Sequence, residues 1–237
     1  MKAIVMAGGK GTRLRPLTDD TPKPMVPLID KPVLRYILDL LKKHGVTDIA
    51  LSLGYMAEKV TDYFGDGKEY GVNLTYFYES EPLGTAGGVK NASRFLTDDD
   101  FFILSGDAYS EIDLTKAFSF HLAKRSHMTL VAQPHPYPKG LGVLEIDFEN
   151  RITNFIEKPS SLRPALVNTG IYVMNRSVLS MIPDGFYDFG RDLLPRLTGR
   201  CYAYIDYSYW SDIGTLGGYY DTNKYLAEKL AESTVDR

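Results

Sequence analysis

The chain has 237 residues, 44% hydrophobic and 24% charged, with a formal net charge of −3. This is the composition of an ordinary globular protein with a sizeable core, and the slight negative charge argues against non-specific nucleic-acid binding. A single cysteine, Cys201, excludes an internal disulfide, and the lack of a leader pattern or of about 20 consecutive apolar residues favours a cytoplasmic protein without a membrane helix.

Strands and helices alternate through the first half. Apolar runs predict strands at 2–7, 48–54, 73–79, 100–107 and 128–134. Helical spacing and caps predict helices at 31–45, 55–67, 85–96 and 113–125. This alternation is typical of βαβ units and favours an α/β protein with a Rossmann-like, mostly parallel sheet flanked by helices.

The second half has a different pattern. It predicts a hairpin over 142–159 that turns at Glu149-Asn150, strands at 166–175 and from 201, a short helix over 185–197 and a final amphipathic helix over 217–233. No linker or repeat separates the halves, so we expect one domain over 1–237. We divide this domain into two halves, residues 1–133 and residues 134–237, the second of which includes the C-terminal helix.

A glycine-rich, cationic loop follows the first strand, in "MAGGKGTRLRPLTDDTPKPMVPL" over 6–28. Glycines at this place let backbone N–H groups face an anion or approach a base. Arg13 offers a fixed fork of donors for phosphate, and Lys23 a movable charge. The loop is neither a Walker A motif nor a G-x-G-x-x-G fingerprint; the alternative is a merely flexible loop.

The segment "AGGKGTRLRPLTDDTPKPMVPLIDKP" resembles the signature of the sugar-1-phosphate nucleotidylyltransferases. The motifs "SEPLGTAGGVK", "SGDA", "GVLEID", "FIEKPS", "VNTGIYV" and "YWSDIGT" follow in that family's order. Within the family, the sequence is most similar to the mannose-1-phosphate guanylyltransferases. The resemblance implies the nucleotide-diphospho-sugar transferase fold and a Mg²⁺-dependent reaction that joins a nucleoside triphosphate to a sugar 1-phosphate and releases pyrophosphate. It also implies that residues 1–133 are the nucleotide-binding half and residues 134–237 the sugar-binding half with the C-terminal helix.

This chemistry needs no general base, because the attacking phosphate is mostly ionised at neutral pH. Positioning and cationic charge have to overcome the repulsion between two anions. The four histidines are scattered and form no nucleophile–base pair with Cys201. That distribution suits phosphoryl transfer and disfavours acyl transfer.

Asp107 and Asp212 are the predicted Mg²⁺ ligands. Asp107 ends a buried strand, and Asp212 is expected in a loop; by resemblance the two meet across one ion. Each aspartate on its own is equally compatible with a turn or a cap. Many relatives have Asn-Gly-Asp where this chain has Ser105-Gly106-Asp107, a change that keeps the carboxylate.

The resemblance assigns the other roles by position. Arg13 would steady the pyrophosphate and Lys23 would bridge nucleotide and sugar phosphate, so Arg13, Lys23 and Asp107 are the predicted catalytic residues, the first two in a solvated cleft. The predicted nucleotide contacts are Ala7, Gly8, Gly9, Gly11, Thr12, Arg13, Pro82, Gly84, Thr85 and Gly87. The predicted sugar-phosphate contacts are Lys23, Gly142, Glu157, Lys158, Asn168 and Gly170. Taken singly, the "EKP" motif could be a solvated turn and "NTG" a strand entry.

The identity of the base and the sugar is less constrained. Residues 82–87 should lie over the base, with Gly8 on its other side and Glu79, Glu81 or the Thr85 hydroxyl as polar contacts. The motif "EPLGTAGG" favours GTP, and mannose 1-phosphate leads among sugars. Glucose-1-phosphate uridylyl- or thymidylyltransferase and manno-heptose-1-phosphate guanylyltransferase are the alternatives.

Two hypotheses come from another class. A non-catalytic regulatory subunit that binds nucleotide sugars predicts the loss of Arg13, Lys23 or a metal aspartate, and all are present. A sugar- or phosphate-binding module without metal leaves Asp107 and Asp212 unexplained. The final helix is expected to dock on its own chain, and the resemblance makes a homodimer a reasonable expectation.

Overall fold

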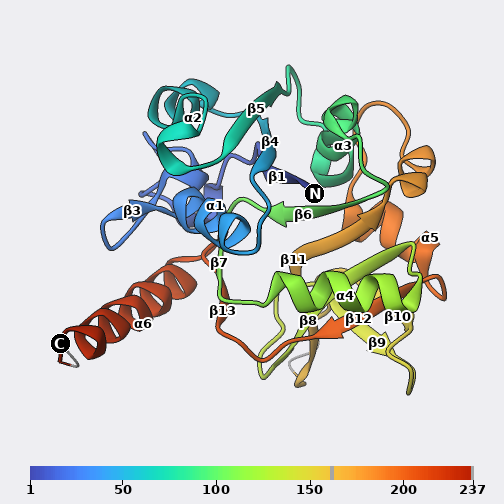
Figure 1. Cartoon of the computed structure of the whole chain (residues 1–237). Coiled ribbons are helices and arrows are strands. Elements are labelled where there is room, and N and C mark those ends of the chain that lie inside the picture. Colours follow the sequence, from blue (N-terminus) through green and yellow to red (C-terminus); the bar gives the residue numbers. More distant parts are fainter. Residues whose placement is uncertain (161–162, 236–237) are drawn as a thin grey trace.

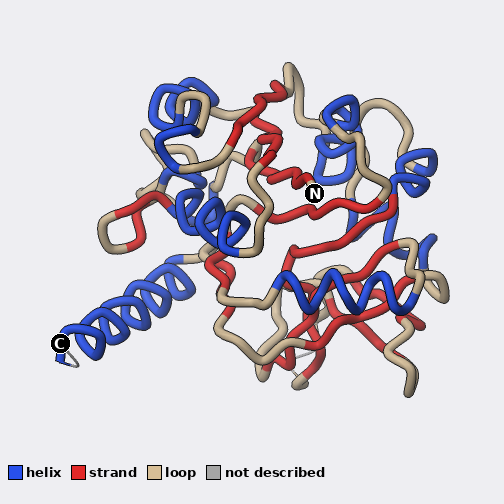
Figure 2. The backbone as a smooth tube through the Cα atoms, viewed as in Figure 1, coloured by secondary structure: helices blue, strands red, loops and turns tan. Residues whose placement is uncertain are grey.

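The computed structural model describes residues 1–160 and 163–235. In this part of the chain one mixed nine-stranded sheet runs through the molecule, with helices on both of its faces (Figures 1 and 2). Its first half is the parallel array β5-β4-β1-β6. These strands are β1 (Lys2–Ala7), β4 (Asp48–Leu53), β5 (Asn73–Tyr78) and β6 (Asp100–Ser105). The predicted α/β class is confirmed.

Antiparallel pairing dominates the second half of the sheet. The long strand β11 (Ala165–Asn175) runs antiparallel to β6 and also to β8 (Met128–His135) and β9 (Val143–Ile146). Strand β10 (Ile152–Ile156) completes the predicted hairpin with β9, and β12 (Cys201–Ile205) lies parallel to β8. Asn150, in the turn of the hairpin, has the positive φ of 65° that a tight turn requires.

Two apolar layers cover the sheet because side chains alternate along its buried strands. Phe102 and Leu104 of β6 face one layer, whereas Phe101 and Ile103 face the other. Helices α1 (Val33–Lys43), α2 (Ala57–Phe64) and α4 (Leu114–Lys124) pack on the first face. Helices α3 (Gly84–Asn91) and α5 (Leu194–Leu197) pack on the second face, together with a π-helical turn, Phe189–Leu193.

Short elements and the last helix lie beside this core. Strands β7 (Ala108–Ser110) and β13 (Trp210–Asp212) form an antiparallel ribbon, and β2 (Pro27–Leu28) pairs with β3 (Lys31–Pro32). Helix α6 (Leu216–Val235) docks on them at its beginning and then leaves the body of the molecule (Figure 1). The 3₁₀ turns are Thr12–Leu14, Lys23–Met25, Lys68–Tyr70, Ser93–Phe95 and Arg176–Met181.

One detail of the sequence prediction is wrong. Asp212 was expected in a loop, but it ends β13, where it pairs with Ala108. The run around Trp210 is too short and polar to show a strand by periodicity, and only its partner β7 makes it one.

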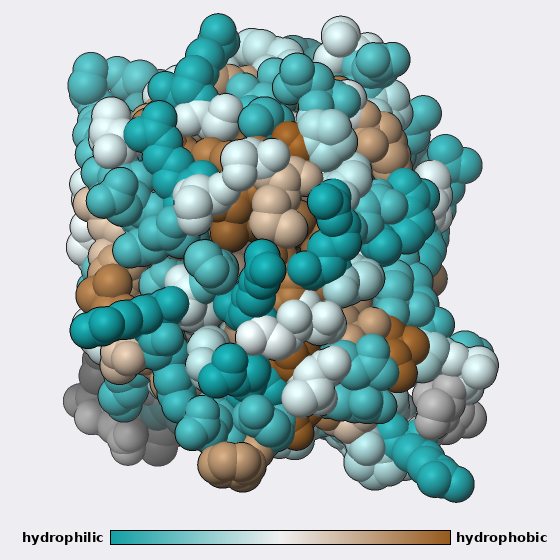
Figure 3. Space-filling model, turned by 90° about the vertical axis from the view of Figure 1, so that its right-hand side faces the viewer, coloured by the Kyte–Doolittle hydropathy of each residue, from teal (hydrophilic) through white to brown (hydrophobic). Residues whose placement is uncertain are grey.

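The surface is mixed in character. The side that carries α3 and α5 is largely hydrophilic, with apolar residues interspersed (Figure 3). Among the described residues, no helix combines the length and the apolar character needed to cross a membrane.

Candidate active site

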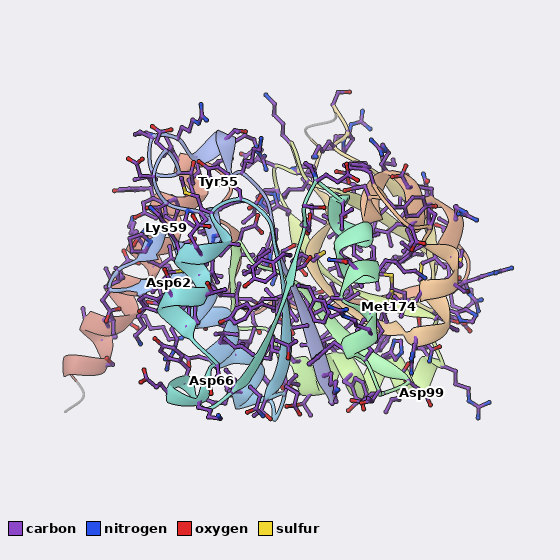
Figure 4. The ribbon with its side chains drawn as sticks, turned by 90° about the horizontal axis from the view of Figure 1, so that it is seen from above. Tyr55, Lys59, Asp62, Asp66, Asp99 and Met174 are labelled. Atoms are coloured by element: carbon purple, nitrogen blue, oxygen red, sulfur yellow. The ribbon has the colours of Figure 1, made fainter. Side chains whose placement is uncertain are left out.

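A cleft of about 810 Å³ opens at the carboxyl edge of the parallel strands. In the view from above, Tyr55, which follows β4, lies toward this edge of the sheet, and Asp66 and Asp99 lie toward the opposite edge (Figure 4). Ligands bind at this edge in open α/β sheets. The cleft is lined by Met6, Gly8, Gly9, Lys10, Gly54, Tyr55, Glu79, Ser80, Glu81, Pro82, Gly84, Thr85, Ser105, Asp107, Phe186 and Asp188.

The glycine loop packs closely at two points. A Cβ on Gly8 would lie 2.9 Å from Oε1 of Glu79, so a larger residue at position 8 would displace that carboxylate. Gly11 has a φ of +63°, and a Cβ there would lie 3.1 Å from Cβ of Lys23. The loop therefore folds back over Lys23 and fixes the position of the first atoms of its side chain.

Lys23 lies between the two predicted metal ligands. Its ammonium contacts the Asp107 carboxylate directly and lies 3.7 Å from Oδ1 of Asp212. Lys23 is only 7% exposed, which corrects the expectation that it lies in a solvated part of the cleft. The loop at Gly11 lies against its aliphatic stem, whereas Arg13 is exposed as expected.

The electrostatics of Asp212 reflect this crowding. Burial, followed by the neighbouring Asp107 carboxylate, raises the pKa of Asp212, whereas Lys23, the N–H of Gly214 and Arg13 act in the opposite direction. The Gly214 N–H donates to Oδ1 of Asp212 over 2.7 Å. A Cβ on Gly214 would lie 2.7 Å from Nζ of Lys23 and 3.2 Å from Nη2 of Arg13. Arg13, Lys23 and Asp212, which are far apart in the sequence, thus meet in one charged cluster.

The cluster fits a divalent cation held with substrate. Two carboxylates lie around the Lys23 ammonium, and Mg²⁺ commonly takes one or two carboxylates plus phosphate oxygens and water. Within residues 1–160 and 163–235, no group of three or more His, Cys, Asp or Glu side chains could hold a metal. Asp107 and Asp212 are therefore suited to an ion that a bound nucleotide helps to coordinate.

Glu79 is fixed at the end of the cleft that is predicted to hold the nucleotide. Its Oε1 accepts from the hydroxyl of the buried Ser52 over 2.8 Å, and its Oε2 accepts from the N–H of Leu83 over 3.2 Å. An ionised carboxylate has about four acceptor positions, so each oxygen keeps capacity for a further donor. Among the polar groups that the sequence suggested for the base, the Glu79 carboxylate lines the cleft, is held by hydrogen bonds and still has acceptor positions to offer.

The start of α3 is interlocked with the loop before the π-helical turn. The carbonyl of Tyr187 accepts from the N–H groups of Ala86 and Gly87, over 3.0 and 2.9 Å. The Thr85 hydroxyl donates to Asp188 and accepts from the N–H of Phe189. Thr85 and Gly87 thus hold the wall of the cleft together, which leaves little of their polar capacity for a base.

The predicted sugar residues meet at the adjoining end. A Cβ on Gly142 would lie 3.2 Å from Oε2 of Glu157, and Nζ of Lys158 lies 3.2 Å from Oε1 of the same glutamate. Asn168 donates to the hydroxyl of Tyr172 over 2.7 Å and accepts from the N–H of Gly170. Gly170 lies in an irregular part of β11, and a Cβ there would lie 2.5 Å from Oγ of Ser105, two residues before Asp107.

Several residues of the site carried no signal in the sequence. Gly190 approaches Glu157 so closely that a Cβ would lie 2.3 Å from Oε2. Burial raises the pKa of Tyr172, and the carboxylates of Asp188, Glu157 and Asp107 add to that shift. Phe186 and Asp188 line the cleft from a segment predicted to be helical. The aromatic run "GFYDFG" could have indicated a loop, but not what it contacts.

Other predicted residues lie apart from the lining. Among the described residues, Ala7, Gly11, Thr12, Arg13 and Gly87 belong to the surrounding framework and not to the wall of the cleft. Cys201 is buried, which raises the pKa of its thiol to about 12, so it is no nucleophile at neutral pH.

Comparison with known proteins places the chain in a family. A model of the nucleotidyl transferase family matches residues 2–229. A UTP–glucose-1-phosphate uridylyltransferase from Synechocystis sp. is 38% identical over 240 residues, which cover 93% of this chain and 62% of that protein. A mannose-1-phosphate guanylyltransferase from Mycobacterium tuberculosis is 37% identical over 240 residues, 99% of this chain and 67% of that protein. The chain thus spans about two thirds of the length of these relatives.

The fold is also similar to that of a solved structure. The crystal structure of HddC from Yersinia pseudotuberculosis complexed with GMP-PN superposes with a TM-score of 0.85 at 30% identity, over 95% of this chain and 99% of that one. The resemblance seen in the sequence is therefore confirmed: this chain belongs to the nucleotidyl transferase family, and the relatives compared with it are named as sugar-1-phosphate nucleotidyltransferases.

Proposed function

We propose that the chain transfers a guanylyl group from GTP to a sugar 1-phosphate, with mannose 1-phosphate as the first candidate, and releases pyrophosphate. The observation that carries this proposal is the cluster of Lys23, Arg13, Asp107 and Asp212 beside the cleft. It puts cationic side chains and a pair of carboxylates where two phosphate groups would have to meet.

Each residue of the cluster has a distinct task. Bound Mg²⁺, held by Asp107 and Asp212, would supply charge neutralisation at the reacting phosphate. Lys23, already buried and aligned, stabilises charge on the phosphate oxygens, and Arg13 presents its guanidinium to the pyrophosphate. Because the attacking oxygen is ionised, no side chain has to remove a proton. Catalysis then rests on positioning two anions against fixed positive charge.

Glu79 supports guanine as the base. Guanine presents two adjacent donors, N1–H and the N2 amine, and a carboxylate with a free acceptor position on each oxygen matches both. Uracil and thymine present one N–H between two carbonyl oxygens, which a carboxylate would repel. Ser52 and Leu83 hold the carboxylate in place, so it cannot turn away. An ill-matched base would leave buried polar groups unpaired, at a cost of roughly 1–3 kcal/mol each.

The sugar would lie against Gly142, Glu157, Asn168 and Gly170. Glu157 accepts hydrogen bonds from the sugar hydroxyls, and Lys158, the next residue in the chain, contacts the phosphate of the sugar. The close approach of Gly142 and Gly190 to Glu157 fixes that carboxylate. Because the contacts are to hydroxyls shared by several hexoses, mannose 1-phosphate is proposed from the resemblance, with manno-heptose 1-phosphate as the nearest alternative.

A uridylyl- or thymidylyltransferase is the second candidate. The relative at 38% identity is named a UTP–glucose-1-phosphate uridylyltransferase. This alternative keeps the charged cluster and its chemistry, and it differs only at the base and the sugar. The Glu79 carboxylate is the feature that argues against it.

Pyrophosphate release from the purified protein with Mg²⁺ tests the proposal. GTP, UTP, dTTP, ATP and CTP are each combined with mannose, glucose and manno-heptose 1-phosphates. We expect the highest kcat/KM for GTP with mannose 1-phosphate. A maximum with UTP or dTTP and glucose 1-phosphate would overturn the assignment of the base and keep the reaction. No release with any pair from folded protein would favour the regulatory subunit. The homodimer, the cytoplasmic location and the absence of nucleic-acid binding stay predictions.

A further inference from the structure

The two metal aspartates are carried by one ribbon of two strands. Asp107 immediately precedes β7, and Asp212 ends β13 opposite Ala108. The N–H of Ile213 donates to the carbonyl of Asp107 over 3.3 Å. Any shift of β13 along β7 would therefore move one carboxylate relative to the other.

The ribbon rests on the beginning of α6. Ile213 and Tyr109 of the ribbon share a buried cluster with Leu226 of α6. The ring of Tyr225 stacks on Tyr209 at a centroid distance of 3.6 Å, with an angle of 5° between the rings. Figure 1 shows β7 and β13 beside the first turns of this helix, before it leaves the body of the molecule.

Polar contacts fix the helix to the same ribbon. Glu111, just after β7, accepts from the Tyr225 and Tyr109 hydroxyls, over 3.1 and 2.7 Å, and forms an ion pair with Lys229. On the other side of α6, Asn223 accepts from the N–H of Ile29 over 2.8 Å. The helix is thus held between the ribbon and the turn that joins β2 to β3.

The first turn of α6 lies directly against Asp212. A Cβ on Gly218 would be 2.2 Å from the carbonyl oxygen of Asp212, a distance that requires the backbone to move. A Cβ on the neighbouring Gly217 would meet nothing closer than Oγ1 of Thr215, at 4.0 Å. Only glycine fits at residue 218, and the atom that excludes larger residues belongs to a metal aspartate.

We propose that α6 is a positioning element for the metal site: through Gly218 and Tyr225 it fixes the β7–β13 ribbon so that Asp107 and Asp212 face one ion. This rests on the proposed function in that it takes these two aspartates as the ligands. Gly218 and Tyr225 touch neither substrate nor metal, and they act through the backbone of the ribbon.

Binding of Mn²⁺ to the protein saturated with GTP, followed by electron paramagnetic resonance, tests the proposal on the whole chain. Gly218→Ala is compared with Gly217→Ala, and Tyr225→Ala with Tyr225→Phe, which keeps the stacked ring. GTP binding without metal, measured by calorimetry, is the second readout, and circular dichroism checks folding. We expect Gly218→Ala and Tyr225→Ala to weaken Mn²⁺ binding by about 10- to 100-fold, with GTP binding unchanged and both control variants like the wild type.

The proposal would be overturned if Gly218→Ala bound Mn²⁺ as tightly as Gly217→Ala, and Tyr225→Ala as tightly as Tyr225→Phe. So would a wild-type protein whose GTP complex binds Mn²⁺ no more tightly than free GTP does. If Gly218→Ala fails to fold, the Tyr225 pair decides. Failure of the proposed function is a separate result: the wild type would release no pyrophosphate from any substrate pair, while the Mn²⁺ titrations would still rank the variants.

Discussion

The charged cluster and the proposed nucleotide end of the cleft are built in different ways. Lys23, Arg13, Asp107 and Asp212 come from segments spread over two hundred residues of sequence, and full charges at short distance dominate their surroundings. Glu79 and residues 82–87 lie close in sequence and are held mainly by hydrogen bonds with backbone groups and hydroxyls. The first region is organised to stabilise charge, and the second to present a shape and a pattern of acceptors.

This difference predicts different kinetic effects. Variants of the cluster should lower kcat for every substrate pair, whereas variants at the nucleotide end should change the ratio of kcat/KM between nucleotides. The following variants are ordered from the largest expected effect to the smallest.

Lys23→Ala removes the buried ammonium between the two carboxylates. We expect kcat to fall by about 100- to 1,000-fold for all nucleotides, because a preorganised charge at the reacting phosphate is lost. Pyrophosphate release under saturating substrate measures it. Lys68→Ala, on the surface with its 2.6 Å ion pair to Asp66, is the matched control and should keep wild-type turnover. Near-normal kcat in Lys23→Ala would remove Lys23 from the catalytic cluster.

Glu79→Gln replaces one acceptor oxygen with an amide donor and keeps the shape. We expect the preference for GTP over UTP to fall by about 10- to 100-fold, since one guanine donor loses its partner. The measurement is kcat/KM for both nucleotides. Glu81→Gln, exposed on the same wall, is the control and should leave the ratio alone. An unchanged ratio in Glu79→Gln would assign base selection to another group.

Thr85→Val removes the hydrogen bonds that join the start of α3 to the segment at 188–189. It removes the bond to Asp188 and leaves the N–H of Phe189 without its acceptor. We expect a loss of about 0.5–1.5 kcal/mol in the free energy of unfolding, and a higher KM for every nucleotide with little change in the GTP-to-UTP ratio. Urea unfolding and steady-state kinetics measure these. A large change in the ratio would instead place the Thr85 hydroxyl on the base.

His121 should affect stability and not the site. Burial lowers its pKa from 6.5, although Asp100 opposes this shift. The unfolded chain then binds more protons at this residue than the folded one as the pH falls below 6.5, so this histidine makes the protein less stable toward acid. Urea midpoints at pH 7 and pH 5.5 should differ less in His121→Gln than in the control His127→Gln. The same slope in both variants would refute this linkage.

Much of the fold could be predicted from local sequence. The apolar runs at 2–7, 48–54 and 100–107 were predicted as strands, and they form parallel strands that are covered by helices on both faces of the sheet. The hairpin that turns at Glu149-Asn150 followed from the strand pattern and its polar turn, whereas the cap that Asp113 gives to α4 was seen only in the structure. The segment around Asp212 was missed as a strand because three residues carry no periodicity.

The sequence by itself determined the family, the sheet and the residue types that phosphoryl chemistry needs, since these depend on spacing and local patterns. Tertiary structure decided which of them meet. Lys23 is buried between two aspartates, and Thr85 joins α3 to the segment that lines the cleft. Gly190 and Tyr172 lie at the predicted sugar site, and Gly218 packs against the backbone of Asp212. These are contacts between segments distant in sequence, and they exist only once the sheet and its ribbon have formed, because no local preference encodes them.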